Sequence, residues 1–240
     1  MTRSNLVVIE DPKSPIAEAY RIARTNIQFA AVDKELKTLL ITSSGPAEGK
    51  STTVANIGAA FAQSGKSVII IDADLRKPTQ HKVWEIDNFR GITNVLLGDA
   101  EIDSVLQKTP IDNLQVSTTG PIPPNPAELL GSQRMSNLLA RFKEYADIII
   151  IDTPPVIAVT DAALLAPQVD GVVLVVASGQ AKIEAAQRSK QMLVNGRARI
   201  LGTILNMVDE DTEDYYYYYY YGEGSGDKKS RKGKNKVATL

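Results

Sequence analysis

The sequence predicts an α/β fold in which a largely parallel central sheet is flanked by helices. Three observations lead to this fold class: short β-branched runs alternate with longer segments of helical periodicity, two of these runs end in aspartate, and a glycine-containing loop joins the first run to a helical segment. Such alternation is typical of parallel strands joined by crossover helices. We therefore expect an open α/β sandwich.

Size and composition agree with this fold class. The chain has 240 residues, of which 43% are hydrophobic and 23% charged, and its formal net charge is −1. These values suit one globular domain with terminal extensions and give no reason to expect a nucleic-acid partner. The chain has no cysteine and one histidine, which excludes disulfides, thiolate metal sites and multi-histidine clusters. Its aliphatic runs are far shorter than the roughly 20 residues that span a bilayer, so we expect a cytoplasmic protein.

The first expected element is an N-terminal helix outside the repeating units. Residues 14–32 have helical periodicity, with Ser14 suited to the N-cap and Pro15 to the first turn. We assign residues 1–36 to this extension and residues 37–208 to the α/β domain.

Six strands and three further helices are expected in the domain. The strands are predicted at residues 38–42, 67–71, 114–117, 147–151, 171–177 and 200–205. The helices, whose apolar residues recur three or four positions apart, are predicted at residues 50–64, 132–145 and 182–194. The proline-rich residues 121–126 are expected to form a rigid connection.

The segment after the first strand has the pattern of a phosphate-binding loop. It consists of Ser44, Gly45, Pro46, Ala47, Glu48, Gly49, Lys50, Ser51 and Thr52. Backbone N–H groups of such a loop converge on phosphate oxygens, Gly49 permits close approach, and Lys50 neutralises phosphate charge. The Ser51 hydroxyl is placed to ligate Mg²⁺. A turn that binds nothing is the alternative, and the strand before the loop and the helix after it argue against that alternative.

Carboxylates end two of the predicted strands. Asp72 and Asp74 follow the second strand and would point the same way in extended backbone, and Asp152 follows the fourth strand. All three are expected at the carboxyl edge of the sheet, where open α/β folds bind ligands. Asp152 is assigned to Mg²⁺ because the prolines that follow end its strand sharply. The alternative for each aspartate is a polar strand exit.

Two further side chains are candidates for contact with a nucleotide. Arg76 could complement phosphate charge near Asp74, or could be a solvated loop cation. Asn206, at the end of the last strand, could read the nucleobase through its amide or could cap a turn.

The chain is predicted to end in a disordered, tyrosine-rich tail over residues 209–240. Residues 209–214 are acidic in five of six positions, and the remainder after residue 221 is rich in Gly, Ser and Lys. Between these segments lies an unbroken run of Tyr215, Tyr216, Tyr217, Tyr218, Tyr219, Tyr220 and Tyr221.

Together these motifs resemble the bacterial tyrosine kinases, which are cytoplasmic P-loop autokinases of capsule and exopolysaccharide systems. The resemblance covers nearly the whole chain and rests on the phosphate loop, the Walker-type elements at residues 69–76 and 148–155, the segment 120–130, and the terminal tyrosines. It implies a P-loop NTPase fold and transfer of the γ-phosphoryl group of ATP, with Mg²⁺, to a tyrosine hydroxyl. Ala47 departs from the pattern, since the loop of the family commonly carries glycine there.

The resemblance also implies roles for residues already named. Lys50 and Arg76 would neutralise charge, and Asp72 would act as the base that accepts the phenolic proton. Asp74 is the alternative base, because the sequence does not say which aspartate faces the metal. The implied metal ligands are Ser51, Asp74 and Asp152.

Partners are implied by the same resemblance. Glu18, Arg21 and Arg24 match a Glu-x-x-Arg-x-x-Arg motif for subunit contact and imply a ring-like homo-oligomer, although an exposed helical ion pair explains them equally well. In such a ring the tail tyrosines would be autophosphorylated in trans. A transmembrane activator of the polysaccharide co-polymerase type, which would recruit the kinase to the inner face of the membrane, and a cognate tyrosine phosphatase are also implied.

Two other functions fit part of the sequence. A partitioning or septum-positioning ATPase would carry an extra lysine early in the loop, where this chain has Gly45, and would lack the tyrosine tail. A nucleotide-sensing scaffold without kinase turnover is compatible with all the motifs. For the tail itself, the alternative to a kinase substrate is a sticky low-complexity segment.

Overall fold

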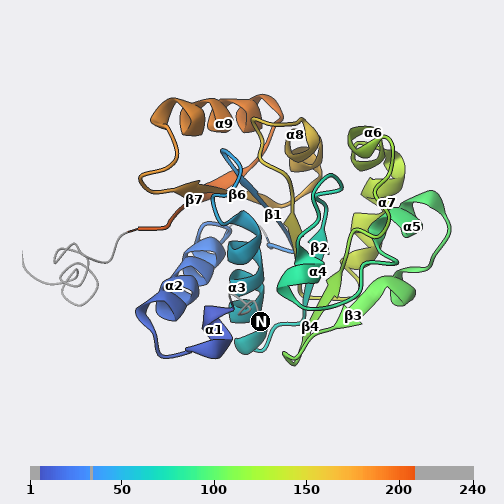
Figure 1. Ribbon diagram of the computed structural model, residues 1–240, viewed down its shortest axis with the longest axis horizontal. Coiled ribbons are helices and arrows are strands. Elements are labelled where there is room, and N and C mark those ends of the chain that lie inside the picture. The colour runs from blue at the N-terminus through green and yellow to red at the C-terminus, as the bar shows by residue number, and fades with distance from the viewer. Residues whose placement is uncertain (1–5, 33–34, 209–240) are drawn as a thin grey trace, which may run out of the picture. The chain divides into compact units, whose positions relative to one another are not determined.

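The centre of the fold is a mainly parallel β-sheet (Figure 1). Within residues 6–32 and 35–208, which the computed structural model describes, the sheet has seven strands in the order β3-β4-β2-β5-β1-β6-β7. The β3–β4 pair is antiparallel and the other neighbouring pairs are parallel. The strands are β1 (Thr38–Ser43), β2 (Val68–Asp72), β3 (Leu106–Lys108), β4 (Leu114–Ser117), β5 (Ile148–Asp152), β6 (Gly171–Ala177) and β7 (Ile200–Asn206).

Helices connect the strands and cover both faces of the sheet. The α-helices of the described residues are α1 (Val7–Glu10), α2 (Pro15–Phe29), α3 (Lys50–Gln63), α4 (Gln80–Val83), α5 (Ile92–Leu97), α6 (Pro126–Leu130), α7 (Gln133–Phe142), α8 (Asp161–Leu165) and α9 (Ile183–Asn195). Two short 3₁₀ helices lie at Ile102–Val105 and Ala166–Gln168.

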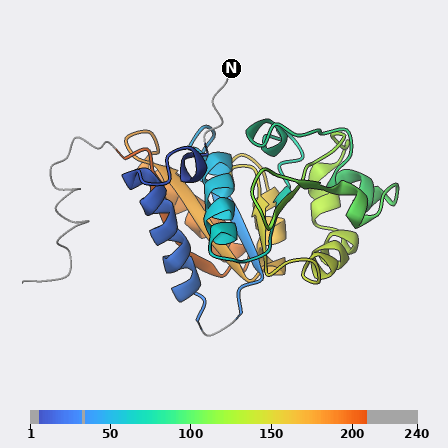
Figure 2. The same cartoon turned by 90° about the horizontal axis from the view of Figure 1, so that it is seen from below.

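The core has two main parts, one on each face of the sheet. Ile69 and Ile71 of β2 pack with side chains of α5, α7, α8 and α9, whereas Ile70 between them packs with α2 and α3. This split follows from the pleat of a strand, which sends successive side chains to opposite faces. Figure 2 shows α2 and α3 side by side on their shared face.

The predicted fold class is confirmed, and so are the six predicted strands and four predicted helices. Each strand ends within one residue of its prediction. The Ser14 hydroxyl accepts a hydrogen bond from the Ala17 N–H at 3.2 Å, so it is the N-cap of α2 as expected.

Short elements were missed by the sequence reasoning. These are β3, α1, α4, α5, α6 and α8, none longer than six residues, and Pro126 begins α6 where only a rigid connection was expected. Such lengths are too short to show a hydrophobic period. The tail at residues 209–240, with its predicted disorder and the tyrosines 215–221, lies outside the described residues.

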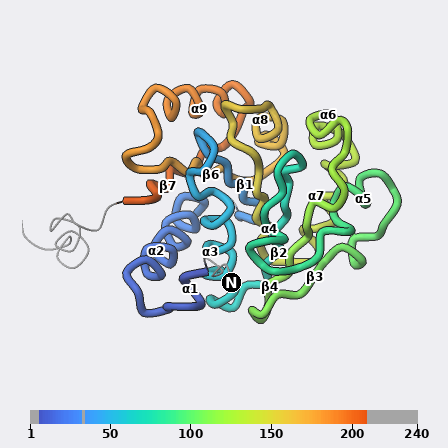
Figure 3. Tube along the Cα trace, in the orientation of Figure 1, coloured from blue at the N-terminus to red at the C-terminus, as the bar shows by residue number. Residues whose placement is uncertain are grey.

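The topology fixes where a ligand can bind. The strands β1, β2 and β5 lie together in the middle of the sheet and are parallel, so their carboxyl ends meet at one edge. The trace in Figure 3 leaves β1 at this edge and enters α3. The phosphate-loop sequence occupies this connection.

Candidate functional site

The phosphate-loop sequence forms a tight connection between β1 and α3. Ala47 has φ 61° and Gly49 has φ 79°, both in the left-handed region. A Cβ at position 49 would also lie 2.1 Å from the Asn206 side-chain nitrogen, so that side chain would have to move. The loop leads directly into the first turn of α3, where unpaired N–H groups and the helix dipole favour phosphate.

Glu48 holds the two ends of the loop together through hydrogen bonds to Ser44. The sequence motif did not predict this role. Its buried carboxylate accepts hydrogen bonds from the Ser44 N–H at 2.9 Å and from the Ser44 hydroxyl at 2.6 Å. Asn206 of β7 donates its side-chain N–H to the Glu48 carbonyl at 2.9 Å. The predicted nucleobase reader therefore contacts the loop itself.

The predicted carboxylates meet beside the loop. Because β2 and β5 pair in register, Asp72 lies directly opposite Asp152. Lys50, which begins α3, donates a hydrogen bond from Nζ to Asp152 Oδ1, and Nζ lies 3.9 Å from Asp74 Oδ2. The sheet register thus brings Asp72 and Asp152 together, and Lys50 lies against Asp152 and Asp74.

Asp72 is sealed in the protein interior. Its carboxylate accepts hydrogen bonds from three backbone N–H groups, those of Asp74 at 3.2 Å, Thr79 at 2.9 Å and Gln80 at 2.8 Å, and its exposed fraction is zero. Burial, together with the neighbouring charge of Asp152, raises the pKa of Asp72 to about 7. The residue therefore anchors the start of α4 and can hold a proton near neutral pH.

Gln80 is a buried member of this site that the sequence reasoning missed. Its side-chain nitrogen donates to Asp152 Oδ2 at 2.7 Å and to the Ser51 carbonyl at 3.1 Å. Its side-chain oxygen accepts from the Trp84 indole N–H at 3.1 Å. Gln80 therefore ties the end of β5 to the first turn of α3, and no sequence pattern signals such a contact between distant segments.

Asp74 and Arg76 lie on the loop after β2. One Asp74 oxygen accepts from the Lys77 N–H at 3.0 Å, and burial is the main cause that raises the pKa of its carboxyl. Arg76 forms a two-point ion pair with Asp161 at the start of α8, with N–O distances of 2.9 and 3.1 Å. The predicted phosphate cation is thus already held by a fully buried carboxylate, which the sequence reasoning did not single out.

The donor set at this edge fits a small, hard cation. The predicted metal ligands Ser51, Asp74 and Asp152 surround a single positive group, since Lys50 Nζ lies 3.0 Å from Ser51 Oγ and contacts both carboxylates. In the described part of the chain, no three His, Asp or Glu side chains are grouped so as to hold a metal by themselves. Magnesium needs few protein ligands, because it retains waters and binds phosphate oxygens.

The side chains of the predicted subunit-contact motif point in two different directions. Arg21 donates to Glu18 Oε2 at 2.9 Å, and this i,i+3 ion pair is exposed on α2. Arg24 instead turns toward α3 and donates to the Ala60 carbonyl at 3.1 Å. The face of α2 that is accessible to a neighbouring subunit therefore includes Glu18 and Arg21. Arg24 instead connects α2 to α3 of its own domain.

Within residues 6–32 and 35–208, no helix has the length and apolar character needed to cross a bilayer.

Comparisons with known proteins identify relatives of this site and fold. Residues 37–195 match a family model described as an AAA domain. The chain is 46% identical to the tyrosine-protein kinase YwqD of Bacillus subtilis over 202 residues, which are 84% of this chain and 85% of that protein. It is 39% identical to the putative tyrosine-protein kinase CapB of Staphylococcus aureus over 90% of this chain and 95% of that protein.

Solved structures agree with these sequence matches. The chimerical protein CapA2B2 has a TM-score of 0.83 at 40% identity, with 86% of this chain and 91% of that chain covered. The kinase domain of the Escherichia coli tyrosine kinase ETK has a TM-score of 0.83 at 35% identity, covering 87% and 82%. The septum site-determining protein MinD of Pyrococcus horikoshii, at 21% identity and a TM-score of 0.62, covers 76% of each chain and shares the fold.

Proposed function

The chain belongs to the bacterial tyrosine-protein kinases, and from this premise we propose that it transfers the γ-phosphoryl group of ATP to tyrosines of its own C-terminal tail in trans. The observation that carries this proposal is the meeting of the phosphate loop, Lys50 and three aspartates at one edge of the sheet. The tail supplies a run of acceptor hydroxyls on the same chain.

Nucleotide binding is assigned to the loop and the start of α3. The loop N–H groups would hold the phosphates, and Lys50 would move its ammonium group from Asp152 to the β- and γ-phosphate oxygens. Ser51, Asp74 and Asp152 would hold Mg²⁺, which when bound offsets the charge of the phosphates. Asn206 is proposed to keep the loop in place from β7 while its strand end borders the nucleobase.

In the transfer step, the tyrosine oxygen forms a bond to the γ-phosphorus as the bond to the bridging oxygen of ADP breaks. The phenolic proton passes to a carboxylate, because the phenol has an ordinary pKa near 10 and benefits from an acceptor as transfer proceeds. Arg76, which is paired with Asp161, is assigned to stabilising the negative charge on the transferred phosphate.

Two carboxylates compete for the role of base. A pKa of about 7 supports Asp72, since a general base is most effective when its pKa is close to the working pH. Asp74 is the less buried of the two and has the better access to an incoming phenol. The pH–rate profiles of Asp72→Asn and Asp74→Asn separate them, because only loss of the base removes the acidic limb.

Assembly and regulation form the wider part of the proposal. The Glu18–Arg21 face of α2 supports a ring-like homo-oligomer, in which the tail of one subunit reaches the site of the next. A transmembrane activator would recruit the kinase to the inner face of the membrane, and a tyrosine phosphatase would reverse the modification. The pathway that this cycle would regulate is the synthesis and export of capsular polysaccharide or exopolysaccharide.

The test is a phosphotyrosine assay on purified protein with Mg·ATP, alone and with candidate activator fragments. Labelling is expected for the wild type, and Lys50→Met should abolish it because the phosphates lose their buried cation. Changing Tyr215–Tyr221 to Phe should remove most labelling and leave nucleotide binding intact. A wild type that hydrolyses ATP under both conditions without acquiring phosphotyrosine would support the switch ATPase instead.

A further inference from the structure

A small groove lies between α5 and α7, and none of the residues that line it belongs to the nucleotide site. Its volume is about 180 Å³, and its apolar lining includes Val95 and Leu96 of α5 and Leu138 of α7. An engineered apolar cavity of about 150 Å³ holds a benzene molecule. The groove is therefore of the size that one aromatic ring fills.

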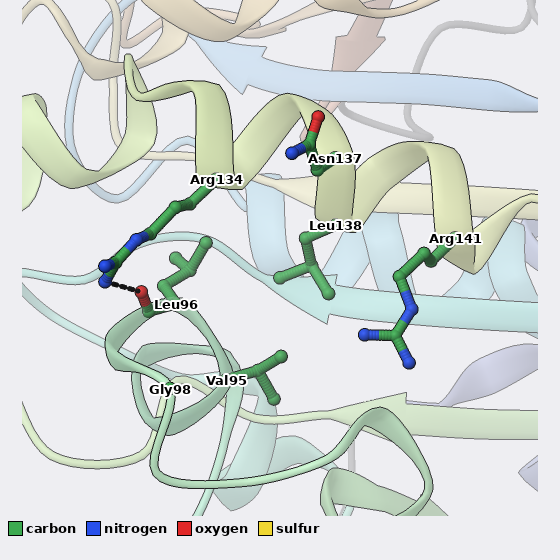
Figure 4. Close-up of a pocket in the computed structure, with 7 residues that line it drawn as sticks. All are labelled: Val95, Leu96, Gly98, Arg134, Asn137, Leu138 and Arg141. Atoms are coloured by element: carbon green, nitrogen blue, oxygen red, sulfur yellow. Dashed lines mark hydrogen bonds between the residues drawn. The ribbon is translucent and has the colours of Figure 1, made fainter.

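Two arginines of α7 flank this apolar floor. Arg134 and Arg141 are seven positions apart, so they share one face of the helix with Leu138, and Figure 4 shows Leu138 between them with Val95 across the groove. Arg134 donates one N–H to the Leu96 carbonyl at 3.0 Å. Arg141 lies 3.5 Å from an exposed Glu101 carboxylate, an ion pair of little energetic value. Guanidinium groups with five N–H donors each are well suited to bind phosphate.

We propose that this groove binds phosphorylated Tyr215 of a second copy of the chain, with the ring between Val95 and Leu138 and the phosphate on Arg134 and Arg141. The tail matches the groove in chemistry, because it carries seven tyrosines directly after an acidic run. Phosphorylation adds up to about two negative charges to each tyrosine, which the arginines complement. The inference rests on the proposed function, since the kinase reaction would supply the phosphate.

The reach of the tail explains why a second copy is the partner. The tail follows β7 at one edge of the sheet, whereas α5 and α7 lie toward the opposite edge (Figure 1). Six strand spacings separate β7 from β3, which is about 29 Å at 4.8 Å each. Tyr215 is seven residues beyond Val208 and extends at most about 25 Å from it. Tyr215 is therefore too close to β7 to cross this width, and it is this first tyrosine of the run that only a second copy can bring to the groove.

Direct binding of a synthetic peptide tests the groove without relying on kinase activity. The protein is the full chain with Tyr215–Tyr221 changed to Phe, and the probe is a fluorescent peptide of residues 209–221 with phosphotyrosine at position 215. We expect fluorescence anisotropy to show binding at least about tenfold tighter than for the unphosphorylated peptide, because charge-assisted hydrogen bonds are added. A peptide with phosphoserine at that position should bind more weakly than the phosphotyrosine peptide, because its phosphorylated residue lacks the ring.

Matched variants locate the binding surface. Arg141→Gln and the double variant with Arg134→Gln should lose most of the phosphate-dependent gain, whereas Arg188→Gln, an exposed arginine on α9, should keep it. Arg141→Gln breaks no contact with the backbone, so a folded variant is available. Unchanged binding by Arg141→Gln and the double variant, or equal binding of phosphoserine and phosphotyrosine peptides, would overturn the proposal.

The second copy is tested with phosphorylated wild-type chain at nanomolar concentration. Its groove should still accept the probe, and prior occupation at every dilution would mean that the subunit binds its own tail, contrary to the proposal. Peptide binding by a protein that never labels itself would refute the proposed kinase function and leave the groove intact. Self-labelling without peptide binding would refute the proposed groove and leave the proposed kinase function intact.

Discussion

At the scale of single residues, the conformation of Ala47 explains a departure that the sequence already showed. The resemblance to the bacterial tyrosine kinases implies glycine at this position, and the backbone of Ala47 has φ 61°, which an L side chain adopts only at a cost of about 1–2 kcal/mol. Glycine avoids this cost, although it also adds freedom to the unfolded chain. The loop of this protein therefore carries local strain beside the proposed phosphate site.

Ala47→Gly is expected to leave the free energy of unfolding equal to that of the wild type or to raise it by up to about 1 kcal/mol. The relieved strain exceeds the 0.4–1 kcal/mol by which glycine typically favours the unfolded state. Urea denaturation measures the change. The control is Ala140→Gly on the exposed side of α7, which should lower stability by about 1 kcal/mol. Equal losses in both variants would contradict the strain at Ala47.

Asp72 gives the protein a characteristic dependence of stability on pH. Its pKa rises from an ordinary 3.8 to about 7 on folding, so between these values the folded protein holds a proton that the unfolded chain has lost. Unfolding then releases a proton, and stability falls as pH rises from about 4 to about 7. The limiting slope for one proton is about 1.4 kcal/mol per pH unit.

Asp72→Asn should remove this contribution. In metal-free buffer with EDTA, we expect the unfolding free energy of the wild type to decrease more steeply than that of the variant between pH 5 and 7. The variant is expected to be less stable overall, because an amide cannot accept all three backbone N–H groups. Parallel pH dependences in the two proteins would show that Asp72 ionises normally.

At the scale of elements, α5 is positioned by a close approach of backbones. The N–H of Ile92 donates to the Thr118 carbonyl at 2.9 Å, and that of Thr93 donates to the Thr119 carbonyl at 3.0 Å. A Cβ on Gly91 would lie 2.0 Å from the Thr118 carbonyl oxygen. The start of α5 can therefore dock on the end of β4 only with glycine at this position.

Gly91→Ala is expected to lower the free energy of unfolding by at least about 3 kcal/mol, the upper part of the range for overpacking, because backbone atoms must move. Thermal denaturation measures the loss. Gly202→Ala on β7 is the control, since its Cβ would meet no atom within 4 Å. Similar melting temperatures for Gly91→Ala and the wild type would contradict the docking of α5. Because α5 lines the groove with Arg134 and Arg141, the first variant should also weaken phosphopeptide binding.

The helices and strands also show which features could be predicted from the sequence. The long strands and helices were predicted because their apolar residues repeat with a clear period, and the loop and Asp152 were found because they sit at strand ends. Gln80 and Asp161 were missed, since each matters through one contact with a distant segment, on Asp152 and on Arg76 respectively. Such pairings depend on tertiary packing and leave no local pattern.

At the scale of the whole molecule, ligand binding should raise the stability of the domain. A nucleotide at 100 times its dissociation constant adds about 2.7 kcal/mol, which corresponds to roughly 5–10 °C in melting temperature for a chain of this size. We expect this shift with Mg·ATP for the wild type and little or none for Lys50→Met. An equal shift in both proteins would place the nucleotide away from Lys50.

The hydrogen bond from Asn206 to the Glu48 carbonyl has a consequence for how the kinase presents its substrate. The same residue also accepts the Ser178 N–H through its carbonyl at 2.7 Å, so it is held from both sides. The tail begins three residues after this point, at Asp209. Asn206, which lies three residues before the tail, is thus hydrogen-bonded to the loop proposed to hold the donor, and a displacement of the Glu48 carbonyl would alter this contact. The side-chain amide of Asn206 therefore connects the strand end that precedes the tail to the loop proposed to bind the nucleotide.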